Sequence, residues 1–467
     1  MVVDVEELPY DDELQPAPEA GPGPARRRLR IAITLVLVAA LVVLAGLEGS
    51  GVIIRTDPEI RATPSAPATA RIAVVDADGT LSSMAAGGGS VVRYPAPGVN
   101  FQFPAWSPDG TRIAAIGTND GGAGIYVFAA PASRSNASAP TIVFLRPDHP
   151  AFYLYWAPDG NALAFLTTEP DGIALRRAPA DAGAPDTILR HGSPMYWQWV
   201  DPTRLLVHSG GDAPDAFVGE VGLDGALAEP NAIEAGPFRA PGVSGSGAYL
   251  AYAAPGQAGS AAIVVESRDG ATHHEVQVFG GAALEFDPVG DTLAFIAPEA
   301  AGAPAQLPVG PLRAVDPASG AVRTLLGGSV VAFFWAPDGR TIAALRLNGP
   351  ADNNVASRAE AVGSLARTGT PPAAQTAAGI LLRVAFVDVA SGSLRSERVG
   401  RLSDLFVSQV LPFFDQYALS HRFWSPDGTS IVLPLGDNQG VSQLTIIPAD
   451  GSDAHQLTAG ALGSWSP

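Results

Sequence analysis

The densest group of potentially reactive side chains in this sequence lies between residues 413 and 422. The stretch FFDQYALSHR carries an acid, an amide, a phenol, an imidazole and a guanidinium within ten positions. Asp415 and His421 could in principle act as an acid–base pair. No serine is placed to complete a nucleophilic group with them, and His421 lacks a second nearby ligand for a metal. We therefore expect binding chemistry here and predict neither catalysis nor a metal site.

The aromatic members of this stretch, set beside its polar ones, would form a mixed apolar and polar surface. Such a surface suits a protein partner or a small ligand. The alternative is structural: the phenylalanine pair fills a central space, and Asp415 pairs with Arg422. The predicted binding residues are Phe413, Phe414, Asp415, Gln416, Tyr417, His421 and Arg422.

This stretch runs directly into WSPDG at 424–428, which is one copy of a repeat. After each copy come two short β-rich runs and usually a third. With the strand that leads into the tryptophan, each unit has four strands, and the unit recurs every 40–50 residues. That period is typical of the blades of a β-propeller. Copies at 199 and 243 are recognisable mainly by their spacing. The copies begin at residues 106, 156, 199, 243, 286, 335 and 424, and a truncated WSP begins at 465.

The motif residues are predicted to be structural. Ser-Pro-Asp-Gly suits a type I turn, in which proline fixes φ and the aspartate accepts backbone N–H groups. Tryptophan is large enough to fill the wedge between neighbouring blades. The residues concerned are Trp106, Asp109, Trp156, Asp159, Trp335, Asp338, Trp424 and Asp427.

The predicted fold class is all-β, with a propeller of four-stranded blades over residues 71–467. Seven complete units, plus one blade that combines strands from both chain ends, favour eight blades; seven remain possible if the end strands are accessory. Two insertions interrupt the pattern. Residues 349–379 are predicted to be a polar loop. Residues 401–423 include a helix that begins at Ser403 and ends at Pro412.

The repeat unit W-[SA]-P-D-G, with its following IAF-like strand, resembles the TolB-like, WD-type propeller repeats of bacterial envelope proteins. The same repeat type occurs in the propellers of tricorn-like and prolyl-oligopeptidase-like peptidases. The resemblance implies a fold and says little about function. This chain departs from both families, because it has no room for the extra TolB domain and no G-x-S-x-G nucleophile motif.

The N-terminal region is predicted to hold the propeller at a membrane. Residues 1–30 form an acidic tail that ends in RRRLR. Within residues 31–54, the 17 apolar residues 31–47 are near the lower limit for a transmembrane helix. The preceding arginines put the N-terminus in the cytoplasm and the propeller outside it. A cleaved signal peptide is the alternative, and residues 55–70 are a linker.

Composition narrows the possible partners. The net charge of −18 and the absence of an arginine cluster outside residues 26–30 argue against nucleic acid. The chain has no cysteine, which excludes disulfides and thiol chemistry. No cofactor is predicted.

Two hypotheses for function follow from these features. The first is a non-catalytic, membrane-anchored propeller outside the cytoplasm that binds a protein partner in the cell envelope. The second is a ligand-binding or hydrolytic propeller acting on a sugar or peptide. A plugged central channel with an apolar outer patch would favour the first hypothesis, and a polar, acid-lined channel under a mobile lid would favour the second.

Overall fold

The computed structural model describes most of the chain after the N-terminal region. The described residues are 70–131, 136–181, 183–210, 216–227, 233–237, 239–256, 260–299, 308–347, 381–436 and 441–467. The predicted tail, anchor and linker (apart from Ala70) and the insertion 349–379 therefore lie outside them. No helix among the described residues is both long enough and apolar enough to cross a membrane.

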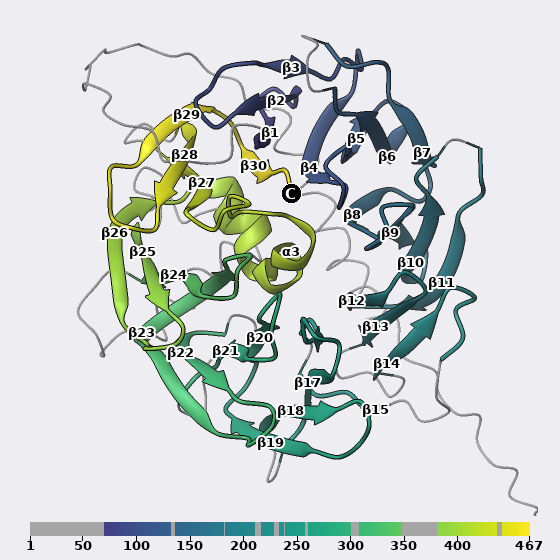
Figure 1. The fold of residues 1–467 in the computed structure, drawn as a ribbon. Helices are drawn as coiled ribbons and strands as arrows, with labels where there is room; N and C mark the ends of the chain where they lie inside the picture. The colour runs from purple at the N-terminus through teal and green to yellow at the C-terminus, as the bar shows by residue number, and fades with distance from the viewer. Residues whose placement is uncertain are drawn as a thin grey trace, which may run out of the picture. The chain divides into compact units, whose positions relative to one another are not determined.

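Antiparallel sheets follow one another in chain order around a ring (Figure 1). We number them as blades. Blade 1 holds β1 (Arg71–Val75), β2 (Leu81–Ala85), β3 (Val92–Arg93) and β30 (Leu462–Trp465); blade 2 holds β4 (Asn100–Trp106), β5 (Arg112–Asn119), β6 (Gly122–Ala129) and β7 (Thr141–Leu145); blade 3 holds β8 (Ala151–Trp156), β9 (Ala162–Glu169), β10 (Gly172–Pro179) and β11 (Thr187–Gly192); blade 4 holds β12 (Met195–Asp201), β13 (Arg204–Ser209), β14 (Phe217–Gly222) and β15 (Ile233–Glu234).

The second half of the ring has the same plan with one shared strand. Blade 5 holds β16 (Gly242–Val243), β17 (Tyr249–Pro255), β18 (Ala261–Ser267) and β19 (His273–Val278); blade 6 holds β20 (Ala283–Phe286), β21 (Leu293–Ile296), β22 (Gly310–Val315) and the start of β23 (Val322–Trp335); blade 7 holds the end of β23 with β24 (Thr341–Leu347), β25 (Leu381–Asp388) and β26 (Leu394–Arg401); blade 8 holds β27 (Ser430–Gly436), β28 (Ser442–Pro448) and β29 (His455–Ala459). In blade 8 a single bridge between Trp424 and Ile431 occupies the innermost place.

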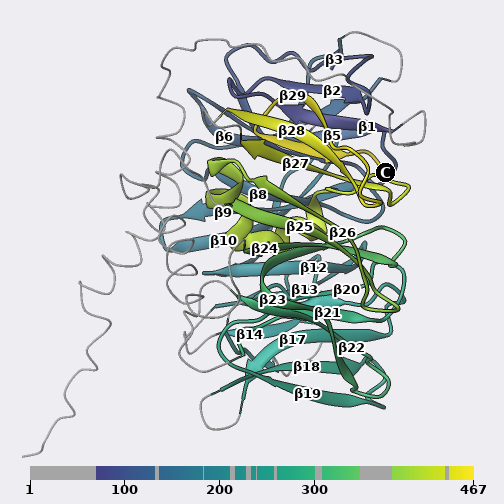
Figure 2. The same ribbon diagram turned by 90° about the vertical axis from the view of Figure 1, so that its left-hand side faces the viewer.

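Both ends of the propeller meet in blade 1, as the sequence predicts. β30 pairs antiparallel with β1, with Ile72 opposite Trp465 and Val75 opposite Leu462. Seen from the side, the strands run across the ring from one face to the other (Figure 2). Because β30 supplies an inner strand to β1, the β1 edge facing the channel is paired rather than exposed.

The motif tryptophans join neighbouring blades in a repeating way. In four of them the indole Nε1 donates a hydrogen bond to a backbone carbonyl in the innermost segment of the preceding blade, one residue before that blade's own motif begins. The four bonds, 2.9–3.1 Å long, join Trp106 to Ser464, Trp156 to Ala105, Trp335 to Glu285 and Trp424 to Phe334.

The motif aspartates hold the turns that follow. Asp109 accepts a hydrogen bond from the Thr111 amide at 3.0 Å, and Asp427 does the same for Thr429. The hydrogen bond from the Ser107 hydroxyl, with that from the Thr111 amide, lowers the pKa of Asp109 to about 2. The degenerate VSGSG copy keeps this turn, because the Gly247 amide donates to the Ser244 carbonyl at 2.8 Å.

Candidate functional site: the filled central channel

The insertion before blade 8 lies in the middle of the ring (Figure 1). It forms a π-helical turn η3 (Phe406–Val410), a 3-10 turn η4 (Leu411–Phe413) and helix α3 (Phe414–Ser420). We call residues 403–421 the plug. Ser403 starts it as predicted, because the Phe406 amide donates to its hydroxyl at 3.3 Å. This first helical segment ends at Val410, just before Pro412, as predicted. Pro412 lies in the first turn of η4, where its missing N–H costs little, and α3 follows as an element that the sequence did not predict.

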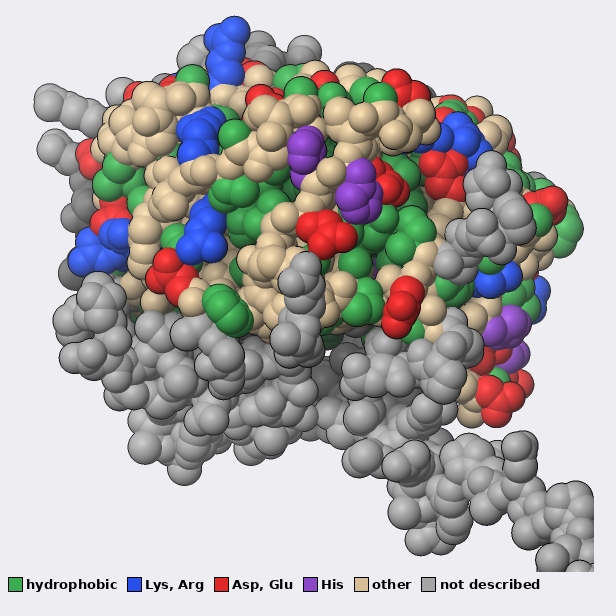
Figure 3. Space-filling view, turned by 90° about the horizontal axis from the view of Figure 1, so that it is seen from below, with side chains coloured by type: hydrophobic (Ala, Val, Ile, Leu, Met, Phe, Trp, Pro, Cys, Tyr) green, Lys and Arg blue, Asp and Glu red, His purple; other side chains and the backbone are tan. Residues whose placement is uncertain are grey.

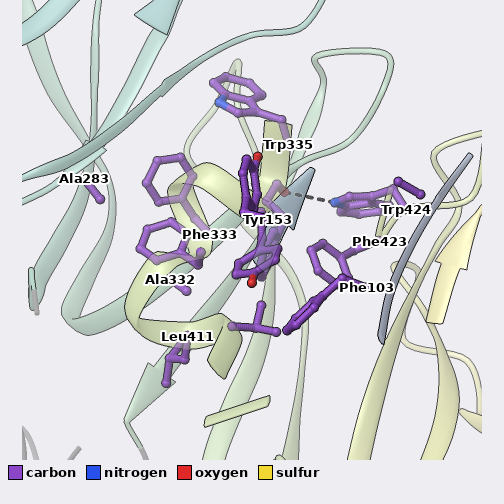
Figure 4. Packing of buried hydrophobic residues seen from close by; sticks show 14 of the residues in the cluster. Phe103, Tyr153, Ala283, Ala332, Phe333, Trp335, Leu411, Phe423 and Trp424 are labelled. Carbon is purple, nitrogen blue, oxygen red and sulfur yellow. Dashed lines mark hydrogen bonds between the residues drawn. The ribbon is translucent and has the colours of Figure 1, made fainter. Parts of the chain in front are cut away.

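Aromatic side chains from several blades pack on the plug (Figure 4). The Phe103 ring of blade 2 stacks on the Tyr417 ring at 5.0 Å between centroids. Phe333 of blade 7 meets Phe414 edge-on at 5.5 Å. Both plug residues are almost completely buried, at 6% and 1% exposure respectively. The plug is therefore part of the hydrophobic core, and contacts of this kind hold it in place.

Gln416 ties the plug to two blades through four hydrogen bonds. Its side-chain oxygen accepts from the Trp197 amide at 3.0 Å, and its Nε2 donates to the Trp197 carbonyl at 2.9 Å. Nε2 also donates to the Tyr153 hydroxyl, which in turn donates to the Gln416 carbonyl, both at 2.9 Å. A buried amide satisfied in this way fixes the rotation of α3 against blades 3 and 4.

Asp415, in the first turn of α3, is fully buried. Its Oδ2 accepts a hydrogen bond from the Ala240 amide at 3.3 Å, and its Oδ1 has no partner among the described residues. Burial raises its pKa, against the opposing effect of the Arg239 charge. The predicted pairing of Asp415 with Arg422 is not found, because no ion pair joins them in the described part of the chain.

His421 ends α3 in an apolar setting. Its Nδ1 lies 2.8 Å from the Ser420 hydroxyl, and its ring meets those of Phe103 and Tyr417 edge-on. Burial lowers its pKa to about 4, so the imidazole is neutral near pH 7. Within the described residues no hydrogen bond joins His421 to Asp415.

The predicted mixed surface is therefore not formed by most of these residues, and their burial agrees with the structural alternative, in which the phenylalanine pair fills a central space. Phe414, Asp415, Gln416, Tyr417 and His421 are buried, and Phe413 is half-buried. The physical reason is that the insertion turns into the channel, where aromatic residues gain more by packing than at a rim. Arg422 alone of the seven is exposed.

A second group next to the plug consists of three polar residues, Tyr155, Glu285 and Arg422. Tyr155 and Glu285 come one residue before the motifs of blades 3 and 6, and Arg422 comes two residues before the motif of blade 8. Gln198, one residue before the motif of blade 4, is not part of this group, because its Oε1 accepts a hydrogen bond from the Val243 amide of the next blade at 2.7 Å. Sequence reasoning missed Glu285. A polar residue directly before a motif is the signal that could have found it.

The described residues contain no group of three or more His, Asp or Glu side chains that could hold a metal ion. What the channel does offer is a packed plug and, beside it, the polar group of Tyr155, Glu285 and Arg422. The chemistry available is recognition by ionic and hydrogen-bonding groups.

No family model matches the sequence, and no curated protein is similar to it. Among solved structures, dihydro-heme d1 dehydrogenase NirN in complex with DHE is 12% identical, with a TM-score of 0.51, over 87% of this chain and 76% of that one. Oligogalacturonate lyase in complex with manganese is 12% identical, with a TM-score of 0.44, over 83% of each chain. TolB from Acinetobacter baumannii is 12% identical, with a TM-score of 0.35, over 71% of this chain and 67% of that one.

The ring of antiparallel, mostly four-stranded sheets defines the class of this chain: it is a β-propeller. At this level of identity the likeness shows the fold alone.

Proposed function

We propose that this chain is a non-catalytic propeller that binds a protein partner in the cell envelope, held at the membrane by residues 31–47. The observation that carries the proposal is the plug. The channel interior, where a propeller can hold a substrate, is occupied by the chain's own residues. The side-chain amide of Gln416, in α3, makes its hydrogen bonds to Tyr153 and Trp197 of the same chain and not to a ligand.

The outer surface supports the same proposal. Figure 3 shows acidic, basic and apolar side chains interspersed over the face seen from below. Large apolar residues are exposed on outer strands, including Ile142 on β7 and Leu394 and Val399 on β26. A mixed surface of this kind resembles ordinary protein interfaces more than a single-charge surface would.

Because the chain lacks cysteine, single-cysteine variants can test where the propeller sits. In intact cells, a membrane-impermeant maleimide should label Val399→Cys on β26 and leave Ala17→Cys in the N-terminal tail unlabelled. Permeabilised cells provide the control, in which both positions should react. Labelling of both positions, or of the tail alone, in intact cells would contradict the proposed location.

Single-cysteine variants can also test for a partner. A photoactivatable maleimide crosslinker is attached at Ile142→Cys, Leu394→Cys or Val399→Cys in cells. Leu394 and Val399 lie on the same strand, whereas Ile142 lies on another blade. A partner that binds one face should therefore crosslink strongly either from both Leu394→Cys and Val399→Cys or from Ile142→Cys, and weakly from the other blade. Crosslinking that is equal from all three positions, or absent from all, would count against a defined interaction face.

A further inference from the structure

Tyr155, Glu285 and Arg422 come from three blades that are not neighbours in the ring. Blades 3, 6 and 8 can bring side chains together only at the central channel. Burial raises the pKa of Tyr155, and the charges of Arg422 and Glu285 both act on it, in opposite directions. Tyr155 therefore lies within electrostatic reach of the other two. These residues face the channel beside the plug.

The plug does not satisfy this group. It bonds residues two or three places before a motif, namely Tyr153, Trp197 and Ala240. Tyr155 and Glu285 come one place before a motif, nearer to the turns. Solvent reaches them in part, and Arg422 is exposed.

All three side chains keep unused hydrogen-bonding capacity. The Arg422 guanidinium and the Tyr155 hydroxyl have no hydrogen bond or ion pair in the described part of the chain. Glu285 Oε2 is buried and also without a partner there. Such groups are costly to leave unpaired, and their convergence at a place that solvent reaches points to a ligand.

The chemistry of the three groups selects the ligand. Arg422 is a permanent cation whose planar guanidinium fits a carboxylate through two parallel bonds. The Tyr155 hydroxyl can donate a further hydrogen bond. Burial raises the pKa of Glu285 well above its usual range, and the Asp415 charge adds to this, which favours the protonated carboxyl, a form that can donate a hydrogen bond.

We propose that Arg422, Tyr155 and Glu285 form a binding site for a carboxylate-bearing ligand at the solvent-accessible end of the channel, beside the plug. The carboxylate pairs with Arg422 and accepts a hydrogen bond from Tyr155. Either a small carboxylic acid or the C-terminus of a peptide could supply the carboxylate. The proposed site is therefore independent of the proposed binding of a protein partner at the outer surface.

The test is calorimetric titration of purified full-length protein at fixed ionic strength with three probes. These are succinate, N-acetyl-trialanine with a free C-terminal carboxylate, and the same peptide as its amide. We expect one or both carboxylate probes to bind one to one and the amide to bind at least about tenfold more weakly, as loss of a charged hydrogen bond implies. Binding of the peptide acid alone identifies a chain terminus as the source, and binding of succinate identifies a small acid.

Matched variants locate the site. Arg422→Gln should weaken binding at least about tenfold, and Tyr155→Phe, which removes only the hydroxyl, should weaken it severalfold. Arg340→Gln makes the same charge change at an exposed turn of blade 7 and should have no effect. Equal melting temperatures confirm that the variants are folded.

Two results would overturn the inference. One is that neither carboxylate probe binds at millimolar concentration. The other is that Arg422→Gln does not lose affinity specifically. This would be so if it binds as wild type does, or if Arg340→Gln loses as much affinity, since the effect would then come from overall charge. Neither result bears on the crosslinking test of a protein partner, so the two proposals can fail separately.

Discussion

At the scale of single residues, the motif tryptophans differ in a way their letters do not reveal. The indole N–H of Trp424 bonds the Phe334 carbonyl at 3.0 Å. Trp465 is completely buried, yet its Nε1 has no partner in the described residues. Since a buried unpaired donor costs free energy, the two tryptophans contribute differently to stability.

We therefore predict different costs for the same substitution at these two positions. Trp424→Phe should lower the free energy of unfolding by about 1 kcal/mol more than Trp465→Phe, because only Trp424 loses a hydrogen bond. Both variants lose similar ring volume, so each serves as the control for the other. The measurement is denaturant unfolding followed by circular dichroism, and equal losses would contradict the assignment.

At the scale of elements, the plug is a helical segment that the ring holds through a few polar contacts. Gln416 satisfies its amide fully, whereas the side-chain nitrogen and oxygen of Gln409, on the same segment, are buried without partners. Gln416 therefore fixes the orientation of α3 through hydrogen bonds, whereas Gln409 contributes packing volume and no side-chain hydrogen bond within the described residues. This contrast supplies a matched pair of variants.

Gln416→Leu should destabilise the protein by roughly 2–4 kcal/mol, because it leaves the Trp197 amide and carbonyl buried and unpaired. Gln409→Leu removes two unsatisfied groups and should be neutral or stabilising. Thermal and denaturant unfolding of both variants would check this. A larger loss from Gln409→Leu than from Gln416→Leu would contradict the hydrogen-bond network.

Acid should loosen the plug through His421. Its pKa in the folded protein is lowered to about 4 by burial, compared with about 6.5 when exposed. A lowered pKa means that the contribution of His421 to stability is fully present above pH 6.5 and is lost as the pH falls towards 4. The loss between pH 6.5 and pH 5 is on the order of 2 kcal/mol.

His421→Asn, which cannot titrate, should show a smaller loss of stability over this pH range than wild type. The comparison uses the change in unfolding free energy between pH 7 and pH 5 for each protein, because the substitution also has a cost that does not depend on pH. An unchanged pH dependence would show that His421 is not the group responsible.

At the scale of the whole molecule, closure of the ring depends on a single short strand. β30 pairs with β1, and the Ser464 carbonyl accepts the indole bond of Trp106 from blade 2. Trp465 and Leu462 are buried in this joint. Without β30, the inner edge of β1 would be exposed and could pair with another chain.

Removal of residues 461–467 should therefore cost roughly 5 kcal/mol from lost burial alone and should promote aggregation. Removal of the exposed Pro467 alone is the control and should have little effect. Differential scanning calorimetry with light scattering would measure both. Wild-type stability in the longer truncation would mean that β30 does not close the ring.

The sequence alone determined the propeller, because a blade is a local unit. Its strands are close in sequence, and the WSPDG turn is fixed by the conformational preferences of its own residues. Even the poorly matching VSGSG copy is correctly placed by its spacing. The joining of the two chain ends in one blade followed from counting strands.

Only the tertiary structure decided what the residues of 401–423 do. Phe414, Gln416 and Tyr417 look like a surface group in the sequence, because nothing local says which way an insertion turns. Their burial depends on side chains from blades 2, 3, 4 and 7, which are up to 314 positions away for Phe103 and Tyr417. The grouping of Tyr155, Glu285 and Arg422 depends on the ring in the same way, since three separate blades must close before these residues share one channel.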